Sequence, residues 1–291
     1  MVQPVTEDQI LQASYPDPPQ LITSKTPISR LDSKIGRAYY ERGVEESKRT
    51  YIYSSTTILS NTLTKGIGFS MWLGNSISYE HAMEYANKRA FIGTMTHAMI
   101  MYLIWGETVD TNTGFYNEDT GEIEKVPNEV KLRLQGFIEF YKDFLPKPIS
   151  TEISLYTDLK DEEGELKFPW AGTADQILRM PDGKLWLVDI KTGKEYPKDH
   201  QLQLTSYKLL WDHIHGDDHG EIDKLACLYL NSRGKYKLKE YKFVPYNWYN
   251  VYENFEYMIR DGRGSLPKIE EKKPLPDIYT LNEKKEIKDV G

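Results

Sequence analysis

Residues 172–193 read GTADQILRMPDGKLWLVDIKTG. Two apolar runs with strand-like spacing flank Asp182-Gly183, a dipeptide typical of tight hairpin turns. Asp175 lies before the first run, and Asp189 lies at the end of the second. The stretch therefore predicts a β-hairpin that places carboxylates at the edge of a buried sheet, where their solvation is incomplete.

Lys191 follows Asp189 by two positions, so strand alternation puts both side chains on one face. If Asp175 lies on the neighbouring strand, two carboxylates and one ammonium group meet in one patch. An unpaired buried carboxylate is costly, and a cation is the usual remedy. Oxygen ligands of this kind suit Mg²⁺ or Mn²⁺, which bind phosphate oxygens. Such an ion can activate water and neutralise a phosphoryl transition state while the lysine positions the attacking water.

Each motif alone is weak, because an Asp-x-Lys pair is more often a surface ion pair and Gly-Thr-Ala-Asp can form a simple turn. In combination, their order and spacing resemble the PD-(D/E)XK nuclease superfamily and its RecB-like exonuclease branch. The resemblance spans about residues 90–210 and rests on four motifs, which are Gly93–His97, Gly172–Asp175, Asp189–Gly193, and Gln203 with Tyr207.

The resemblance implies a set of metal ligands and a catalytic lysine. The implied ligands of one or two Mg²⁺ or Mn²⁺ ions are His97, Asp175, Asp189 and the main-chain carbonyl of Ile190. Lys191 takes the place of the lysine that assists the nucleophile. Glu152 occupies the place where many relatives have a glutamate that supports the site or a second metal. From the residues alone, a hydrogen-bonded core histidine in an apolar helix is the favoured interpretation of His97, and only the downstream motifs favour metal binding.

Substrate contacts are expected on both sides of these residues. Gln203 and Tyr207 match a helical motif that in relatives contacts substrate phosphate. We also expect Thr192 and Lys194 to contact the substrate, with His200 beside the departing DNA. The histidines at 213, 215 and 219 are interpreted as part of a solvated loop.

The surrounding pattern predicts an α/β fold in which a mixed central β-sheet is flanked by helices, as in a restriction-endonuclease-like core. Helices are predicted over 78–105, after Pro127, over 199–215 and over 246–260, and strands near 153–155, 177–178, 185–190, 224–231 and 235–243. The predicted divisions are an N-terminal arm and helical elaboration at 1–78, a nuclease core at 79–261 and a C-terminal tail at 262–291.

Composition removes several classes of protein. The chain has 291 residues, of which 39% are hydrophobic and 28% charged, as in a soluble globular protein. The single cysteine, Cys227, excludes a four-cysteine iron–sulfur cluster or zinc site. The sequence contains no glycine-rich phosphate loop or long apolar stretch, and residues 1–8 lack the basic and apolar regions that would predict a signal peptide. We therefore expect no membrane partner, and a location in the cytoplasm of a bacterium or a phage-infected host.

The net charge of -7 is unevenly distributed along the chain. Residues 101–130 carry seven acidic side chains and one lysine, whereas 224–242 carry six basic and one acidic. Residues 25–49 add seven basic against four acidic side chains. Because DNA binding depends on the local field, we expect a polarised molecule with 101–130 turned away from DNA.

These observations predict a metal-dependent DNA exonuclease of phage-type recombination, replication or repair. DNA is the expected partner, and a single-strand annealing or other recombination protein is a further candidate. The alternatives are a structure-specific or restriction-type endonuclease on the same core and a catalytically inactive nucleic-acid-binding module. The residues themselves do not separate DNA from RNA.

Overall fold

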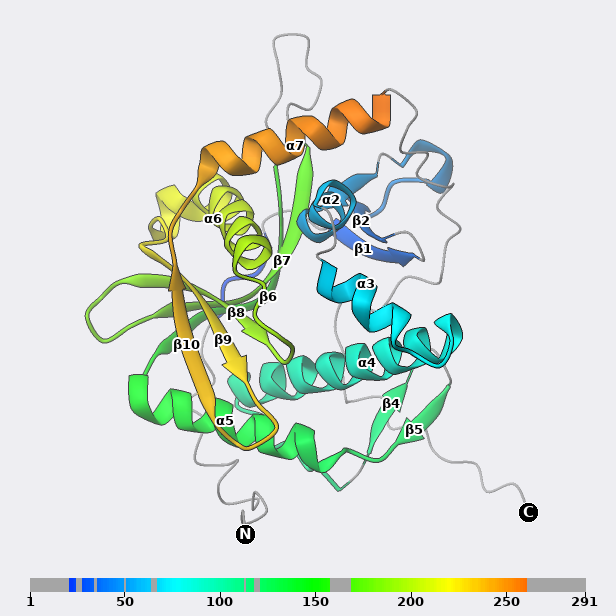
Figure 1. Ribbon diagram of the computed structural model, residues 1–291. Coiled ribbons are helices and arrows are strands. Elements are labelled where there is room, and N and C mark those ends of the chain that lie inside the picture. The colour runs from blue at the N-terminus through cyan, green and yellow to red at the C-terminus, as the bar shows by residue number, and fades with distance from the viewer. Residues whose placement is uncertain are drawn as a thin grey trace.

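The structure is a computed structural model that describes residues 21–24, 28–33, 36–49, 51–63, 67–112, 114–117, 121–157 and 169–260. Its centre is a mixed β-sheet flanked by helices (Figure 1), which confirms the predicted fold class. The strands of the main sheet are β1 (Ile28–Ser33), β2 (Gly36–Glu41), β3 (Ile52–Ser54), β6 (Lys147–Tyr156), β7 (Trp170–Arg179), β8 (Leu185–Lys191), β9 (Lys224–Leu230) and β10 (Tyr236–Tyr241). The helices are α2 (Ser55–Thr62), α3 (Ile67–Gly74), α4 (Tyr79–Ile104), α5 (Asn128–Phe144), α6 (Pro197–His219) and α7 (Pro245–Arg260), with a short 3₁₀ turn at Glu46–Lys48.

The sheet order is β1-β2-β3-β7-β8-β9-β10, and β6 pairs with β7 beside this path. Two of the pairings, β3 with β7 and β8 with β9, are parallel, and the others are antiparallel. A sequence pattern gives no strand polarity, so this mixture emerges only in the folded chain. In the described parts of the chain, no helix combines the length and apolar content needed to cross a bilayer.

The feature that positions the candidate site is a fork between β7 and β8. Their antiparallel ladder runs from Arg179 opposite Leu185 to Gln176 opposite Val188 and stops there. The other half of β7 pairs with β6 and β3, while the end of β8 continues beside β9. Asp175 and Asp189 are therefore the first residues of the two strands beyond their shared ladder.

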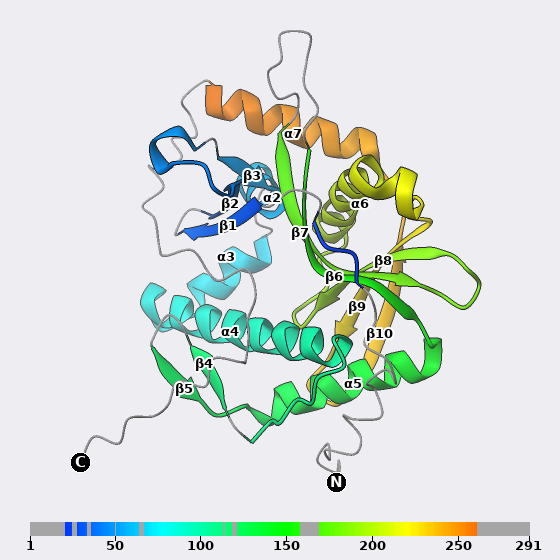
Figure 2. The same cartoon turned by 180° about the vertical axis from the view of Figure 1, so that it is seen from behind.

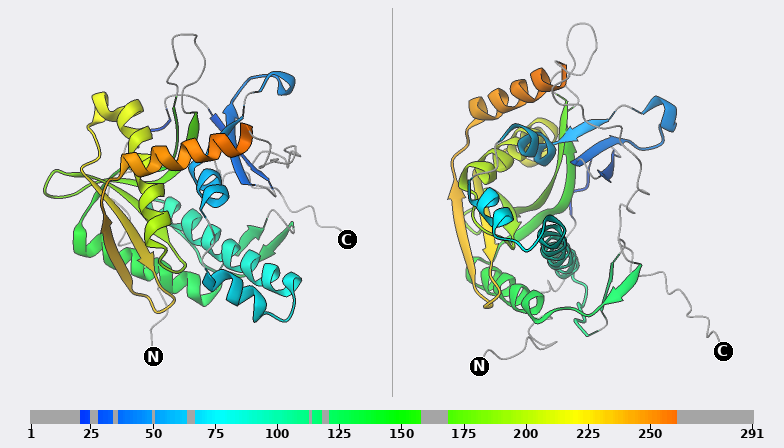
Figure 3. Two further views of the ribbon diagram at one scale, coloured as in Figure 1. Left: turned by 45° about the horizontal axis from the view of Figure 1, so that its top comes forward. Right: turned by 45° about the vertical axis from the view of Figure 1, so that its right-hand side comes forward.

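Two hydrophobic cores pack against the sheet. One joins α4 and α5 to apolar side chains of β7, β8 and β9, with Phe137 and Phe140 almost fully buried. The other joins α2, α6 and α7 around Trp211 and Trp248. Figures 2 and 3 show the same division, with α2, α6 and α7 grouped together and α4 and α5 side by side away from them. Helices from both groups reach the fork.

Three regions differ from the sequence-based expectations. Where a helical elaboration was predicted, Ile28–Ser54 forms three strands that extend the main sheet before α2 and α3 begin. A small hairpin, β4 (Phe115–Asn117) with β5 (Glu122–Glu124), was not predicted because each strand has only three residues. Helix α6 continues to His219, so the three histidines lie on a helix instead of a loop, and His215 is buried. The predicted tail at 262–291 lies outside the described residues.

Candidate metal centre

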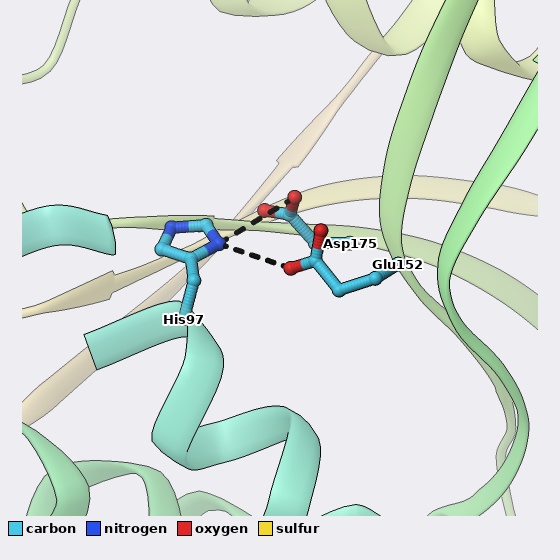
Figure 4. Close-up of side chains that lie close together, drawn as sticks. All are labelled: His97, Glu152 and Asp175. Atoms are coloured by element: carbon cyan, nitrogen blue, oxygen red, sulfur yellow. Dashed lines mark hydrogen bonds and ion pairs between the residues drawn. The ribbon is translucent and has the colours of Figure 1, made fainter. Parts of the chain in front are cut away.

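His97, Glu152 and Asp175 come together from α4, β6 and β7 (Figure 4). The Nδ1 atom of His97 lies 3.4 Å from Oε1 of Glu152 and 3.6 Å from Oδ1 of Asp175. One potential ligand atom from each residue lies within 4.8 Å of the other two. Nitrogen and oxygen donors so close together are able to share one divalent cation.

The backbone holds two of these side chains in specific places. Asp175 accepts a hydrogen bond of 2.6 Å through Oδ2 from the main-chain N–H of Ile190, and this bond bridges β7 and β8 just beyond their ladder. Glu152 has a φ of 46°, a left-handed conformation that a non-glycine residue rarely adopts within a strand. Strain of this kind is typical of functional sites, where the surrounding structure holds the residue in place.

A second group lies beside the first and is centred on Lys191. Its Nζ atom forms an ion pair of 2.5 Å with Oδ2 of Asp189 and donates to Oε1 of Gln203 at 2.9 Å. The amide nitrogen of Gln203 donates to the hydroxyl of Tyr207 at 2.9 Å and to Oδ1 of Asp189 at 3.4 Å. The end of β8 and the first turns of α6 therefore share one hydrogen-bonded network that fixes the lysine.

Gly172 explains how Tyr207 reaches this position. A Cβ atom on residue 172 would lie 2.3 Å from Cε1 of the tyrosine ring, well inside van der Waals contact. Only glycine allows the ring to pack against β7 here. The first residue of the Gly-Thr-Ala-Asp motif is thus a packing requirement.

Three carboxyl groups, of Glu152, Asp175 and Asp189, meet two basic groups inside this site. Burial alone would lower the pKa of His97, but the charges of Asp175 and Glu152 outweigh it and raise the pKa to about 9. Burial raises the pKa of Asp175; His97 opposes this shift, and the charge of Asp189 adds to it. Burial would lower the pKa of Lys191, but Asp189 and Asp175 raise it, so Lys191 remains an ammonium group. The carboxylates therefore stabilise positive charge on both basic neighbours.

The structure brings most of the predicted site residues to the fork, with a different grouping from the predicted one. Glu152, whose match is looser, joins His97 and Asp175, whereas Asp189 pairs with Lys191. Ile190 meets Asp175 through its N–H group. Beyond this cluster, Lys194 is exposed. His200 is 7% exposed and forms a hydrogen bond with the hydroxyl of Tyr229, so its ring lies inside the protein and not at the surface.

The basic segment at 224–242 is partly neutralised by acidic side chains. Glu195 pairs with both Lys237 and Lys239, and two further pairs join Lys224 to Glu240 and Lys235 to Glu139. The net charge of this segment along the sequence therefore overstates the positive field at its surface.

The acidic segment at 101–130 lies mostly apart from the fork. Figures 1 and 2 show the β4–β5 hairpin on the side of α4 that faces away from β6 and β7. Glu129 is the exception, because it accepts hydrogen bonds from Arg89 and Arg133, and Arg133 also reaches the carbonyl oxygen of Thr192. Sequence reasoning missed these two arginines, since neither lies in a recognisable motif.

Comparison with known proteins adds little. No protein-family model matches the chain, and no curated protein matches it. One solved structure, described as "Crystal structure of SSO0001", overlaps with 44% of this chain and 57% of its own chain at 19% sequence identity and a TM-score of 0.30. The overlap thus spans little more than half of that structure's chain.

Proposed function

We propose that this chain is a divalent-metal-dependent deoxyribonuclease that hydrolyses phosphodiester bonds from DNA ends. The observation that carries the proposal is the meeting of His97, Glu152 and Asp175 beside the Asp189–Lys191 ion pair at the fork. The choice of DNA and of end-directed cleavage rests on the motif resemblance.

The donor set fits Mg²⁺ or Mn²⁺. Hard carboxylate oxygens suit both ions, and the imidazole nitrogen adds a ligand that transition metals such as Mn²⁺ accept. The raised pKa of His97 reflects the carboxylates around it, whose charge a bound cation would neutralise in place of a proton. His97, Glu152 and Asp175 would hold the ion, with Asp189 next to them. When bound, the ion supplies water activation and charge neutralisation at the phosphate.

The chain's own residues supply positioning and a fixed positive charge. Lys191 is held by Asp189 and Gln203, so its Nζ retains donor capacity for a phosphate oxygen or the attacking water. A preorganised ammonium group of this kind stabilises the negative charge that develops during phosphodiester hydrolysis. Tyr207, bonded to Gln203, adds a hydroxyl that is able to orient a substrate phosphate.

The experiment compares end-labelled linear DNA, circular DNA and RNA of matched sequence in Mg²⁺, Mn²⁺ or EDTA. The variants are Asp175→Asn and Lys191→Ala, and the matched control is Lys184→Ala, which removes a half-exposed lysine in the β7–β8 turn. We expect metal-dependent loss of linear DNA with wild type and the control but not with the two site variants.

Other outcomes separate the alternatives. Cleavage of circular DNA would favour an endonuclease on the same core. Cleavage of RNA but not DNA would identify RNA as the substrate. Metal-independent binding without any cleavage would favour a catalytically inactive nucleic-acid-binding module. Absence of metal-dependent cleavage of every substrate would refute the proposed activity.

A further inference from the structure

A buried charge network lies beside the metal centre, between α4, α5 and the loop that follows β8. Arg133 on α5 is 2% exposed and donates through Nη1 to Oε2 of Glu129 at 2.9 Å and through Nη2 to the carbonyl oxygen of Thr192 at 3.4 Å. Glu129 also accepts from Nη1 of Arg89 on α4, at 2.9 Å and 2.7 Å. One carboxylate therefore orients two guanidinium groups.

The same face of α4 reaches both this network and the metal centre. Arg89, Gly93 and His97 follow one another at intervals of four residues, so they lie one turn apart along one face of the helix. A Cβ atom on Gly93 would lie 3.3 Å from Oγ1 of Thr192, which places α4 tightly against the loop. Arg89 is then about 12 Å from His97 along the helix axis.

The network carries an unneutralised positive charge. Two arginines face one carboxylate, and the hydrogen bonds of Glu129 lower its pKa against the effect of burial, so it stays ionised. Arg133 is enclosed, but the side chain of Arg89 is 35% exposed and, in the described residues, donates through Nη1 alone. Its remaining N–H groups are left for another acceptor. On β10, Lys237 and Lys239 also share one carboxylate, that of Glu195, but their ammonium groups lack the planar fork of a guanidinium group.

We propose that Arg89 binds a backbone phosphate of the DNA strand next to the cleavage site, with its guanidinium group oriented by Glu129. A planar guanidinium held by one carboxylate presents its free edge in a fixed direction, which suits phosphate recognition. Arg133 is a positioning residue in this arrangement, because it ties Glu129 to the loop that carries Thr192 and Lys194. The inference rests on the proposed function, since it names a substrate contact of that site.

The test has two measurements. The first gives KM and kcat for a short end-labelled DNA in Mg²⁺. The second gives the affinity for the same DNA over a range of salt concentrations, with Ca²⁺ replacing Mg²⁺. Arg89→Gln is compared with Arg89→Lys and with Lys88→Gln, which removes an equal charge from the neighbouring exposed position. We expect Arg89→Gln to raise KM about tenfold with little change in kcat, and to reduce the salt slope by about 0.7–0.9, the effect of one phosphate contact. Arg89→Lys should fall between, because the charge remains but the planar fork is lost.

Two results would overturn the inference while leaving the nuclease proposal intact. One is an Arg89→Gln enzyme that cleaves DNA with the KM and salt slope of Lys88→Gln. The other is a loss confined to kcat with KM unchanged, which would indicate distortion of the metal centre instead of a lost phosphate contact. If wild type neither binds nor cleaves the DNA, the proposed function itself fails, and the substrate contact fails with it.

Discussion

The fork between β7 and β8 and the lysine-rich surface of β9 and β10 handle charge in opposite ways. On β9, β10 and the turn between them, four lysines pair with three glutamates at the surface, which leaves a small positive excess in contact with water. At the fork, Glu152, Asp175 and Asp189 converge in a largely buried space and raise the pKa of their basic neighbours. Surface pairs of the first kind contribute little energy. The second arrangement costs stability unless a cation completes it, and so it indicates a function that needs one.

The largest effect is expected from removing the fixed cation at the fork. Lys191→Ala should lower the rate of DNA cleavage by about 10²–10³-fold, a typical loss for one preorganised charge-stabilising donor. Single-turnover kinetics at saturating Mn²⁺ would measure it, with Lys184→Ala as the control. A loss below about threefold would contradict the catalytic role of Lys191.

A pH-dependent stability effect is expected at His200, which lies between the two regions. Burial and the charge of Lys191 lower its pKa to about 4, whereas in the unfolded chain it is about 6.5. On acidification the unfolded chain gains this proton first, so stability should fall as pH drops from about 6.5 to about 4. The difference corresponds to up to about 3 kcal/mol before solvent screening.

Urea unfolding of wild type and His200→Gln at several pH values would measure this contribution. Glutamine keeps a hydrogen-bonding group near Tyr229 but does not titrate, so its stability curve should be flatter over that pH range. Parallel curves for the two proteins would show that His200 is not held neutral by its surroundings.

A smaller effect is expected from packing at the fork. Gly172→Ala places a methyl group against the ring of Tyr207, which must move and carry Gln203 with it. Overpacking of this kind costs about 1–3 kcal/mol. The melting temperature and the cleavage rate of Gly172→Ala should both be lower than those of wild type. The control is Gly183→Ala, in the exposed turn, which should lower stability because residue 183 has a positive φ, without altering the cleavage rate of the folded enzyme. An unchanged cleavage rate in Gly172→Ala would show that the position of Tyr207 does not matter for cleavage.

The smallest effect is expected on the lysine-rich surface. Lys237→Gln and Lys239→Gln each break one exposed pair with Glu195, and each should change unfolding free energy by less than about 1 kcal/mol. DNA affinity should change less than in Arg89→Gln, because each of these lysines is already paired with Glu195. A tenfold loss of DNA affinity in either lysine variant would show that the lysine-rich surface binds DNA, which contradicts the contrast between this surface and the fork.

Sequence alone predicted the parts of the fold whose periodicity is strong. Helices α4, α5, α6 and α7 and the β7–β8 hairpin follow from apolar spacing and from the Asp182-Gly183 turn. The strands β1 to β3 were missed because they are short, lie in a charged segment and gain their place only by pairing with β7.

The membership of the site was predicted more accurately than its grouping. Motif spacing brought His97, Asp175 and Lys191 together, but the pairing of Asp189 with Lys191 depends on how β7 and β8 separate. The left-handed backbone of Glu152 is a property of the folded chain. Arg89 has no local signal, because its partner Glu129 comes from another helix. Arg133 pairs with Glu129 at the common i,i+4 spacing, which does not reveal that the arginine is buried.

The central claim is that the carboxylates at the fork gather to hold a divalent cation. Anomalous scattering from crystals of the full chain soaked in Mn²⁺ tests it most directly, with Asp175→Asn crystals soaked in parallel. We predict one strong manganese peak within ligand distance of His97, Glu152 and Asp175, and its loss in the variant. A wild-type crystal with no manganese at the fork, or with manganese bound only elsewhere, would contradict the claim.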